Sequence, residues 1–342
     1  MSQAASALPF TQCELSKVMP ASSLTRRIGH DTFAAIGYAT AWLGGGHDDF
    51  PGYENEWRFR MLDRLVELSC THWDSASSYG DSEELIGKWL NRTGQREKIF
   101  LATKFGLFKQ PDGSSIMINS PDLRESLNQS LKRLNADMID IFYVHYYDKR
   151  FLIENTMEAL AEYVKAGKIW YIGLCEPTVD RLRRAHKVHP VAAIQVEHSP
   201  FELKIETKGI LSTARELGVA VVAYSPMGKG LLDEQIKSHS GFGENDPRKS
   251  KLKYSQENFP KISELVNGFK DIAIRHNATP GQIALAYLLA QGDDIIPIPV
   301  GKCINDIGEN LGAQEIGLTP EELELLRKLV EHAESKPGHN GL

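Results

Sequence analysis

Four residues in the first half of the chain have side chains that together could transfer a proton. Asp74 is followed five residues later by Tyr79 in the stretch WDSASSYGD. Lys104 stands in ATKFG, and His145 ends FYVH. The unperturbed pKa of a phenol is about 10, and a nearby ammonium favours the phenolate, which brings proton transfer from Tyr79 within reach at neutral pH. Asp74 could keep a buried Lys104 protonated, and His145 could donate to a substrate oxygen or relay a proton. Together they would make an acid that protonates a developing alkoxide.

Each of these residues also has an ordinary structural explanation. Asp74 could cap the following helix, and Tyr79 could pack on the rim of the fold. Lys104 could be a solvated lysine at a strand end, and His145 could be a core histidine with its hydrogen bonds satisfied. The combination favours chemistry, because the residues follow three consecutive predicted strands and the carboxyl ends of parallel strands form the ligand-binding edge of a sheet.

Eight short apolar runs rich in β-branched residues predict eight strands. They cover residues 33–40, 71–76, 99–106, 138–145, 169–176, 192–200, 219–227 and 295–300. Segments with helical spacing lie between them, at 55–69, 82–91, 121–134, 154–166, 178–186, 207–217 and 279–289. Near-continuous apolar strands that alternate with helices imply a parallel sheet covered on both faces, and eight such units favour a closed (β/α)8 TIM barrel. A doubly wound sheet is the alternative, but no GxGxxG follows the first strand and no GxxxxGK[ST] occurs.

Three segments are expected beyond the eight units. Residues 1–30 form an N-terminal extension, and residues 31–342 form a single barrel domain. A long loop at 228–259 follows the seventh strand, and we expect it to act as a flap over a ligand. An additional C-terminal helix covers 319–334, opening with a Thr, Pro, Glu, Glu cap.

Composition excludes several classes of protein. The 342 residues carry a formal net charge of −6, with acidic and basic residues mixed along the chain, which argues against nucleic-acid binding. No apolar run is long enough to span a membrane, and the N-terminus does not resemble a signal peptide, so a cytoplasmic protein is expected. The four cysteines form no cluster, so neither a metal site nor a disulfide framework is predicted. The oligomeric state stays open.

The motifs resemble those of the aldo-keto reductase superfamily. DSASSYGDSEELIGKWL is similar to the family's aspartate-to-tyrosine signature, and the likeness runs from RRIGHDTFAAIGYATAW to IPVGKCINDIGENLGA. The resemblance implies that Asp74, Tyr79, Lys104 and His145 correspond to the catalytic tetrad. It further implies transfer of a hydride from a nicotinamide C4 to the carbonyl carbon of an aldehyde or ketone. Tyr79 would give the proton to the carbonyl oxygen, and His145 would orient the carbonyl.

The resemblance also implies NADPH bound in extended form at the strand ends. Gln195 would bond the carboxamide, Tyr224 would stack on the nicotinamide ring, and the turn SPMGKG at 225–230 would wrap the pyrophosphate. The residues expected along the cofactor are Thr40, Cys175, Glu176, Gln195, Tyr224, Ser225, Pro226, Met227, Gly228, Gly230, Lys302, Asp306, Glu309 and Asn310.

Two departures from the family pattern bear on the choice of cofactor. Cys175 replaces the usual serine, and a thiol is a weak hydrogen-bonding partner. Asp306 stands about where many relatives have a cationic or amide side chain, and a carboxylate there would repel a 2′-phosphate. NADPH is the first expectation, through Lys302, Glu309 and Asn310, and NADH is the alternative.

The substrate is the least predictable part of the site. Trp42, Tyr146 and Tyr147, together with the loop 107–120, are the expected pocket residues, and their rings suggest an apolar or planar carbonyl compound. A small aldehyde, a pyridoxal-like ring, an open-chain sugar and a polyketide-type carbonyl would all be compatible. A regulatory barrel that senses nicotinamide nucleotides with little catalysis is the rival interpretation. A metal-dependent hydrolase is disfavoured because clustered ligands are missing.

Overall fold

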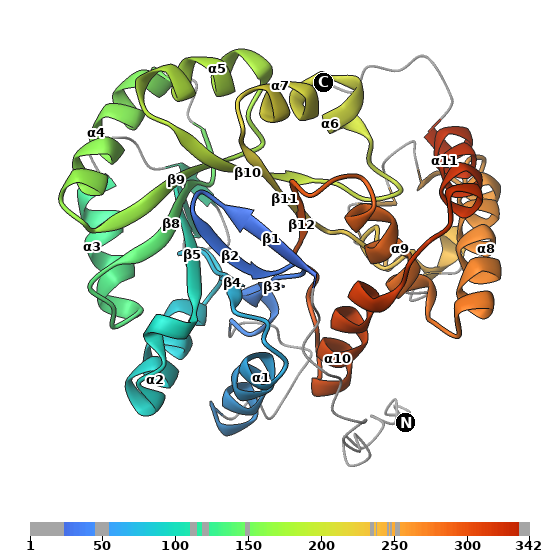
Figure 1. Cartoon of the computed structure of the whole chain (residues 1–342), viewed down its shortest axis with the longest axis horizontal. Helices are drawn as coiled ribbons and strands as arrows, with labels where there is room; N and C mark the ends of the chain where they lie inside the picture. The colour runs from blue at the N-terminus through green and yellow to red at the C-terminus, as the bar shows by residue number, and fades with distance from the viewer. Residues whose placement is uncertain are drawn as a thin grey trace.

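The computed structural model describes residues 24–44, 55–109, 115–117, 123–147, 151–232, 236, 238–244, 246, 248–249 and 254–334. Eight parallel strands lie at its centre, in the order β12-β11-β10-β9-β8-β5-β4-β3 (Figure 1). Their bounds are β3 (Tyr38–Ala39), β4 (His72–Asp74), β5 (Phe100–Phe105), β8 (Ile139–Val144), β9 (Ile169–Cys175), β10 (Val191–Glu197), β11 (Ala220–Tyr224) and β12 (Ile295–Pro297).

Backbone hydrogen bonds close this sheet into a ring. The N–H of Gly37 donates to the carbonyl of Pro297 at 3.0 Å, and the N–H of Ala39 donates to that of Pro299 at 3.3 Å. The first and last strands are therefore joined, and the predicted (β/α)8 barrel is confirmed. Its closure gives every strand two neighbours and leaves one mouth at the carboxyl ends for a ligand.

Helices surround the strands on the outside (Figure 1). They are α1 (Asn55–Glu67), α2 (Ser82–Thr93), α3 (Leu123–Arg133), α4 (Ile153–Lys165), α5 (Val179–Val188), α6 (Lys204–Thr207), α7 (Ile210–Glu216), α9 (Pro280–Leu289) and α10 (Ile304–Gly312). Their apolar faces pack on the outward side chains of the strands, whereas the inward side chains of the strands form a separate core inside the barrel. In the described part of the chain, no helix has both the length and the apolar character that a membrane span requires.

A β-hairpin covers the amino-terminal end of the barrel. Strands β1 (Thr25–Ile28) and β2 (Asp31–Ala34) pair antiparallel and lie across the centre of the barrel in Figure 1. Ile28 and Phe33 belong to the same buried cluster as Phe100 inside the barrel, so the hairpin plugs this end. The apolar run at 33–40 is thus divided between β2 and β3. The limit expected at residue 30 falls in the turn of the hairpin, and the division into extension and barrel stays a prediction.

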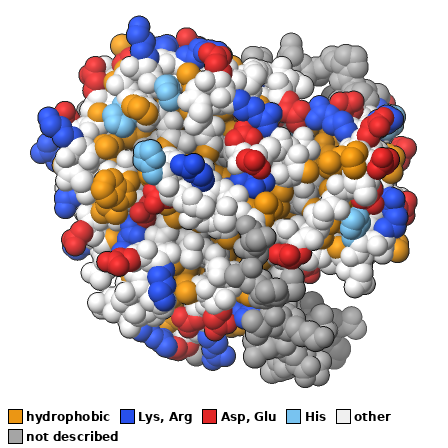
Figure 2. Space-filling view, in the orientation of Figure 1, with side chains coloured by type: hydrophobic (Ala, Val, Ile, Leu, Met, Phe, Trp, Pro, Cys, Tyr) orange, Lys and Arg blue, Asp and Glu red, His pale blue; other side chains and the backbone are white. Residues whose placement is uncertain are grey.

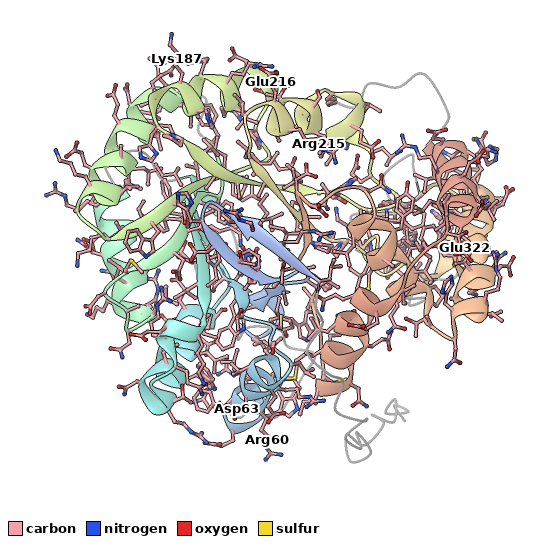
Figure 3. The ribbon with its side chains drawn as sticks, in the orientation of Figure 1. Arg60, Asp63, Lys187, Arg215, Glu216 and Glu322 are labelled. Carbon is pink, nitrogen blue, oxygen red and sulfur yellow. The ribbon has the colours of Figure 1, made fainter. Side chains whose placement is uncertain are left out.

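An additional helix, α8 (Phe259–His276), follows the loop after β11 and was not part of the predicted pattern. It packs against the predicted terminal helix, here α11 (Pro320–Glu334), at one side of the barrel (Figure 1). Glu322 of α11, labelled in Figure 3, accepts from His276 Nε2 at 2.9 Å and pairs with Arg275 at 3.4 Å. Part of the preceding loop lies outside the described residues, so its role as a flap stays a prediction.

Charged side chains of both signs are mixed over the face shown in Figure 2. Many of them form local pairs, such as Arg215 with Asp294 at 2.8 Å and Arg183 with Glu216 at 2.5 Å. No broad basic patch is visible on this face, which agrees with the mixed charge pattern of the sequence.

His72 is buried in the barrel interior. Its ring lies 4.7 Å from that of Phe33 and 5.4 Å from that of Phe100. Neither ring nitrogen has a partner within the described residues. Burial, with a smaller contribution from Lys104, lowers the pKa of His72 to about 3. The unfolded chain therefore binds a proton between about pH 6.5 and pH 3 that the folded chain excludes.

This difference predicts that His72→Leu makes the protein more resistant to acid. Above about pH 6.5 neither state binds the proton, but below it each such histidine lowers the free energy of unfolding by about 1.4 kcal/mol per pH unit. Between about pH 7 and about pH 5, urea unfolding should show a loss of stability that is about 2 kcal/mol smaller in His72→Leu than in the wild type. The exposed His30→Leu is the control. Identical pH dependence in His72→Leu and the wild type would contradict the assignment.

Candidate active site

The carboxyl ends of three adjacent strands bring Asp74, Lys104 and His145 to the mouth of the barrel. Asp74 ends β4 and is in register with Ala102 of β5, so Lys104 lies two residues further along the neighbouring strand and on the same face as Ala102. His145 directly follows β8, and Tyr79 lies in the loop that leads to α2. Four side chains that are up to 71 positions apart in the sequence (74 to 145) therefore gather at one end of the barrel.

Lys104 is the centre of the group. Its ammonium, which is fully buried, pairs with Asp74 Oδ1 and donates to the backbone carbonyl of Ser75 at 2.7 Å. It also lies 3.3 Å from the hydroxyl of Tyr79 and 4.6 Å from the centroid of the tyrosine ring. Because Asp74 and Ser75 hold the ammonium on one side, its charge is directed at the phenol oxygen on the other.

The carboxylate of Asp74 is held from two further directions. Gln195 Nε2, from β10 across the barrel, donates to Asp74 Oδ2 at 2.7 Å. Thr40 Oγ1 donates to the Asp74 backbone carbonyl at 3.0 Å and is 2.7 Å from Ser82 Oγ. Ser82 Oγ is in turn 2.9 Å from Ser75 Oγ. The serines of the polar stretch thus support Asp74 from behind, and Thr40 belongs to this support.

Tyr79 and His145 form the wall that a substrate would meet. Their rings are 5.9 Å apart and nearly perpendicular, with an interplanar angle of 88°. Nδ1 of His145 is buried and has no partner within the described part of the chain. Burial and the charge of Lys104 lower the pKa of His145 to about 3, so the imidazole is neutral at any working pH.

The electrostatics of Tyr79 differ from the expectation drawn from the sequence. Burial raises the pKa of Tyr79 and outweighs the opposing effect of Lys104, so the hydroxyl keeps its proton. Burial also opposes a charge on Lys104, but Asp74 and Tyr79 outweigh it and raise the pKa of the lysine. The resting arrangement is a neutral phenol beside an ammonium ion, which suits an acid better than a base.

A cavity of about 950 Å³ opens in front of these groups. Most of the predicted site residues line it: Trp42, Asp74, Tyr79, His145, Tyr146, Tyr147, Cys175, Glu176, Gln195, Tyr224, Ser225, Pro226, Met227, Gly230, Lys302, Asp306, Glu309 and Asn310. Three predicted residues do not line it, namely Thr40, Lys104 and Gly228. Lys104 acts from beneath the surface through Tyr79, and Gly228 is buried against the ring of Phe201. The predicted substrate loop at 107–120 lies largely outside the described residues.

Comparison with known proteins decides the family. The model of the aldo/keto reductase family matches residues 35–331. The chain belongs to this family. The prediction of an oxidoreductase enzyme is thereby confirmed.

Two relatives of this aldo/keto reductase are informative. An aldo-keto reductase from Strobilurus tenacellus, str7, is 50% identical over 91% of this chain and 93% of its own length. The Schizosaccharomyces pombe protein yakc, named as an NADP(+) aldo-keto reductase, is 43% identical over 91% of this chain and 92% of its own length.

Solved structures agree with the fold. A thermostable aldo-keto reductase in complex with the inhibitor epalrestat has a TM-score of 0.69 and 30% identity, covering 90% of this chain and 99% of that one. A glycerol dehydrogenase from Gluconobacter oxydans has a TM-score of 0.83 at 23% identity, covering 94% and 99%, and this likeness concerns the fold alone.

The turn at 225–230 of this aldo/keto reductase has unusual backbone geometry. Ser225, Gly228, Lys229 and Gly230 all have positive φ, at 53°, 68°, 56° and 93°. Glycine is required at position 228 for two reasons. Its φ is positive, and a Cβ there would come within 2.3 Å of the Phe201 ring. A turn in this conformation can present successive backbone N–H groups to an anion. Its place on the cavity wall is consistent with the predicted pyrophosphate site, which stays a prediction.

The carboxylate of Asp306, in the first turn of α10, binds the segment that leads into this helix. Asp306 Oδ2 accepts from the backbone N–H of Lys302 at 2.6 Å and of Cys303 at 3.1 Å, and Asp306 Oδ1 accepts from the Cys303 thiol at 3.1 Å. The ammonium of Lys302 lies 4.8 Å from the centroid of the Trp42 ring. The Asp306 carboxylate therefore already accepts from the two backbone N–H groups that directly precede α10, those of Lys302 and Cys303.

Several lining residues were not predicted from the sequence. They are Ala41, Ser78, Arg181, Ile298 and Val300. Lys229, which also lines the cavity, lies within the predicted turn at 225–230. Ala39, another lining residue, replaces a glycine of the family pattern near the expected cofactor. Ile298 and Val300 are two positions apart just beyond β12. The alternation of side chains along an extended strand could have predicted that both face the same side. Arg181 sits in the first turn of α5, the helix after the fifth barrel strand, where residues commonly face the mouth of a barrel.

Proposed function

We propose that this aldo/keto reductase reduces an aldehyde or ketone to the alcohol with NADPH, in a reversible reaction in which Tyr79 is the acid. The observation that carries the proposal is the Tyr79 hydroxyl on the cavity wall, 3.3 Å from a buried ammonium. The S. pombe relative named for NADP(+) supports the choice of cofactor. A cavity of about 950 Å³ is at the upper end of the range for small-molecule and cofactor sites, which accords with a nucleotide plus a substrate.

The residues that would hold the cofactor are those that line the cavity away from Tyr79. Gln195 and Tyr224 would contact the nicotinamide, the turn at 225–230 would take the pyrophosphate, and the start of α10 would take the adenosine. The bound nicotinamide supplies the hydride that reaches the carbonyl carbon. The protein supplies position, proton and electrostatics.

Tyr79 would deliver its proton as negative charge develops on the carbonyl oxygen. Its raised pKa keeps the proton in place until a more basic oxygen, a nascent alkoxide, accepts it. The phenolate that results is stabilised by the ammonium of Lys104, which is already oriented by Asp74 and by the Ser75 carbonyl. Lys104 is thus a positioning residue that acts through Tyr79.

His145 would orient the carbonyl as a neutral hydrogen-bond donor. Its low pKa rules out a role as a permanent cation, because protonation beside Lys104 is disfavoured. The perpendicular contact with the Tyr79 ring places the imidazole edge beside the phenol. A carbonyl oxygen could then accept from both side chains at once, which fixes its direction relative to the hydride donor.

Consumption of NADPH with a panel of aldehydes and ketones tests this function directly. We expect multiple turnovers with at least one carbonyl compound and formation of one alcohol per NADPH consumed. Binding of NADPH without turnover of any member of a broad panel would instead favour a regulatory nucleotide-binding barrel.

The carboxylate at the start of α10 predicts the effect of Asp306→Asn. The amide keeps an acceptor for the Lys302 N–H but removes a negative charge from the expected position of the 2′-phosphate. A partly exposed charge pair is worth about 1 kcal/mol, so the dissociation constant for NADPH should fall about fivefold. Titration with NADH, which lacks that phosphate, is the internal control and should change by less than twofold. Equal changes for the two nucleotides would show that Asp306 does not face the phosphate.

A further inference from the structure

Arg181 stands on the cavity wall and is stacked on an aromatic ring. Its guanidinium carbon lies 3.6 Å from the centroid of Tyr147, and both residues line the cavity that contains Tyr79 and His145. The hydroxyl of Tyr147 donates to the carbonyl of Phe151, which fixes the ring. A guanidinium that lies over a ring can still donate from the edge of its plane to a planar anion.

The carboxylates that line the same cavity are engaged elsewhere. Glu176 accepts from the Glu197 N–H at 2.7 Å, and Glu309 accepts from Thr279 Oγ1 at 2.8 Å. Asp306 caps α10 and Asp74 pairs with Lys104, as described above. Each of these carboxylates is therefore bonded to a group other than Arg181.

Arg181 itself has no carboxylate partner within the described residues. The neighbouring Asp180 bonds Arg184 at 3.1 Å, and Arg184 also binds Glu154. Burial lowers the pKa of Arg181 from its usual value, and Tyr147 opposes the shift. Arg181 also lies in the first turn of α5, where the helix dipole favours an added negative charge. A partly buried cation of this kind is stabilised by an anionic ligand.

Aromatic side chains connect Arg181 to the catalytic group. Tyr146 is 48% exposed, and its ring lies 4.9 Å from that of His145, which in turn contacts Tyr79. Trp42 lines the same cavity. We infer that the preferred substrate is an aldehyde or ketone that also carries a carboxylate, bound by the guanidinium of Arg181, with its planar or apolar body on these rings. The inference rests on the proposed function of Tyr79, because it assumes that the carbonyl is placed there.

A matched set of substrates tests this inference. The probes are 3- and 4-carboxybenzaldehyde, each compared with its methyl ester, which has the same ring and carbonyl but no charge. In the wild type, kcat/KM should favour at least one acid over its ester. Arg181→Gln should lower that ratio at least tenfold, mainly through KM of the acid, and Arg181→Lys should restore part of it. Thermal unfolding of each variant checks that the fold is intact.

Two results would overturn the inference. The first is a wild type that shows no preference for either acid over its ester. The second is an Arg181→Gln variant in which kcat/KM for the acid and for the ester changes by the same factor. Arg181 would then only hold the Tyr147 ring in place.

Binding provides a readout that does not depend on turnover. Calorimetric titration of the NADPH-saturated enzyme with 4-(hydroxymethyl)benzoate and with its methyl ester, alcohols that this form of the cofactor cannot oxidise, should show tighter binding of the acid in the wild type and loss of that advantage in Arg181→Gln. If carboxylate binding depends on Arg181 but no aldehyde is reduced, the proposed function fails and the carboxylate site stands. If aldehydes are reduced but the acid has no binding advantage, the proposed function stands and the carboxylate site is rejected.

Discussion

Replacing Tyr79 by phenylalanine is expected to lower kcat for carbonyl reduction by about 10²- to 10⁴-fold, the contribution typical of a general acid. The substitution removes only the hydroxyl group, whose oxygen lies 3.3 Å from Lys104 Nζ. The ring itself and its perpendicular contact with His145 would be kept. The cavity therefore keeps its shape while the proton donor is lost, and the dissociation constant for NADPH should change by less than threefold.

A neighbouring tyrosine gives a matched control for this experiment. Tyr146→Phe removes the same hydroxyl from a ring on the same wall that is not in contact with Lys104. Its kcat should fall far less than that of Tyr79→Phe. A Tyr79→Phe enzyme that retains more than a tenth of wild-type kcat would contradict the role of Tyr79 as the acid.

The second large effect is expected from Lys104→Met. Lys104 and Asp74 are both fully buried, so removal of the ammonium leaves a carboxylate inside the protein with Gln195 as its remaining side-chain partner. Breaking a buried ion pair in this way typically costs about 3–5 kcal/mol. We expect the free energy of unfolding, measured with urea, to fall by about that amount, and carbonyl reduction to be lost because the Tyr79 phenolate is no longer stabilised.

The double variant Asp74→Asn/Lys104→Met separates stability from chemistry. With both charges removed, no ion is left unpaired, so the double variant should be more stable than Lys104→Met alone. Its turnover should stay at the level of the single variant, because the ammonium is still missing. Recovery of activity together with stability would show that the pair serves only the fold.

The barrel could be predicted because each of its strands and helices is indicated by a short, continuous stretch of the sequence. Eight apolar runs with intervening helical periodicity specify eight strand and helix units, and the observed strands fall within or beside those runs. Asp74, Lys104 and His145 each stand at the end of such a run, so the order of the elements is enough to assign all three to one mouth of the barrel. The run at 33–40 was divided differently because a short apolar run does not reveal whether it pairs in a hairpin or in the barrel.

Other features depend on contacts that the sequence does not reveal. The bond from Gln195 to Asp74 crosses the barrel and exists only because the ring is closed. The position of Thr40 behind Asp74 follows from the same closure. The sign of the Tyr79 pKa shift depends on how deeply the hydroxyl is buried, and spacing gives no measure of burial. Helix α8 is different, since its apolar positions recur at helical spacing and a search of that segment would have found it.

The most direct test of the central claim is the fate of the hydrogen at the nicotinamide C4. The wild type would be incubated in ordinary water with benzaldehyde, or with the best substrate of the panel, and with NADPH that carries deuterium at both C4 positions. We predict that each alcohol formed carries one deuterium on its carbinol carbon, and that Tyr79→Phe forms this product at least a hundredfold more slowly. Alcohol without deuterium at that carbon, or equal rates in the two enzymes, would contradict the account.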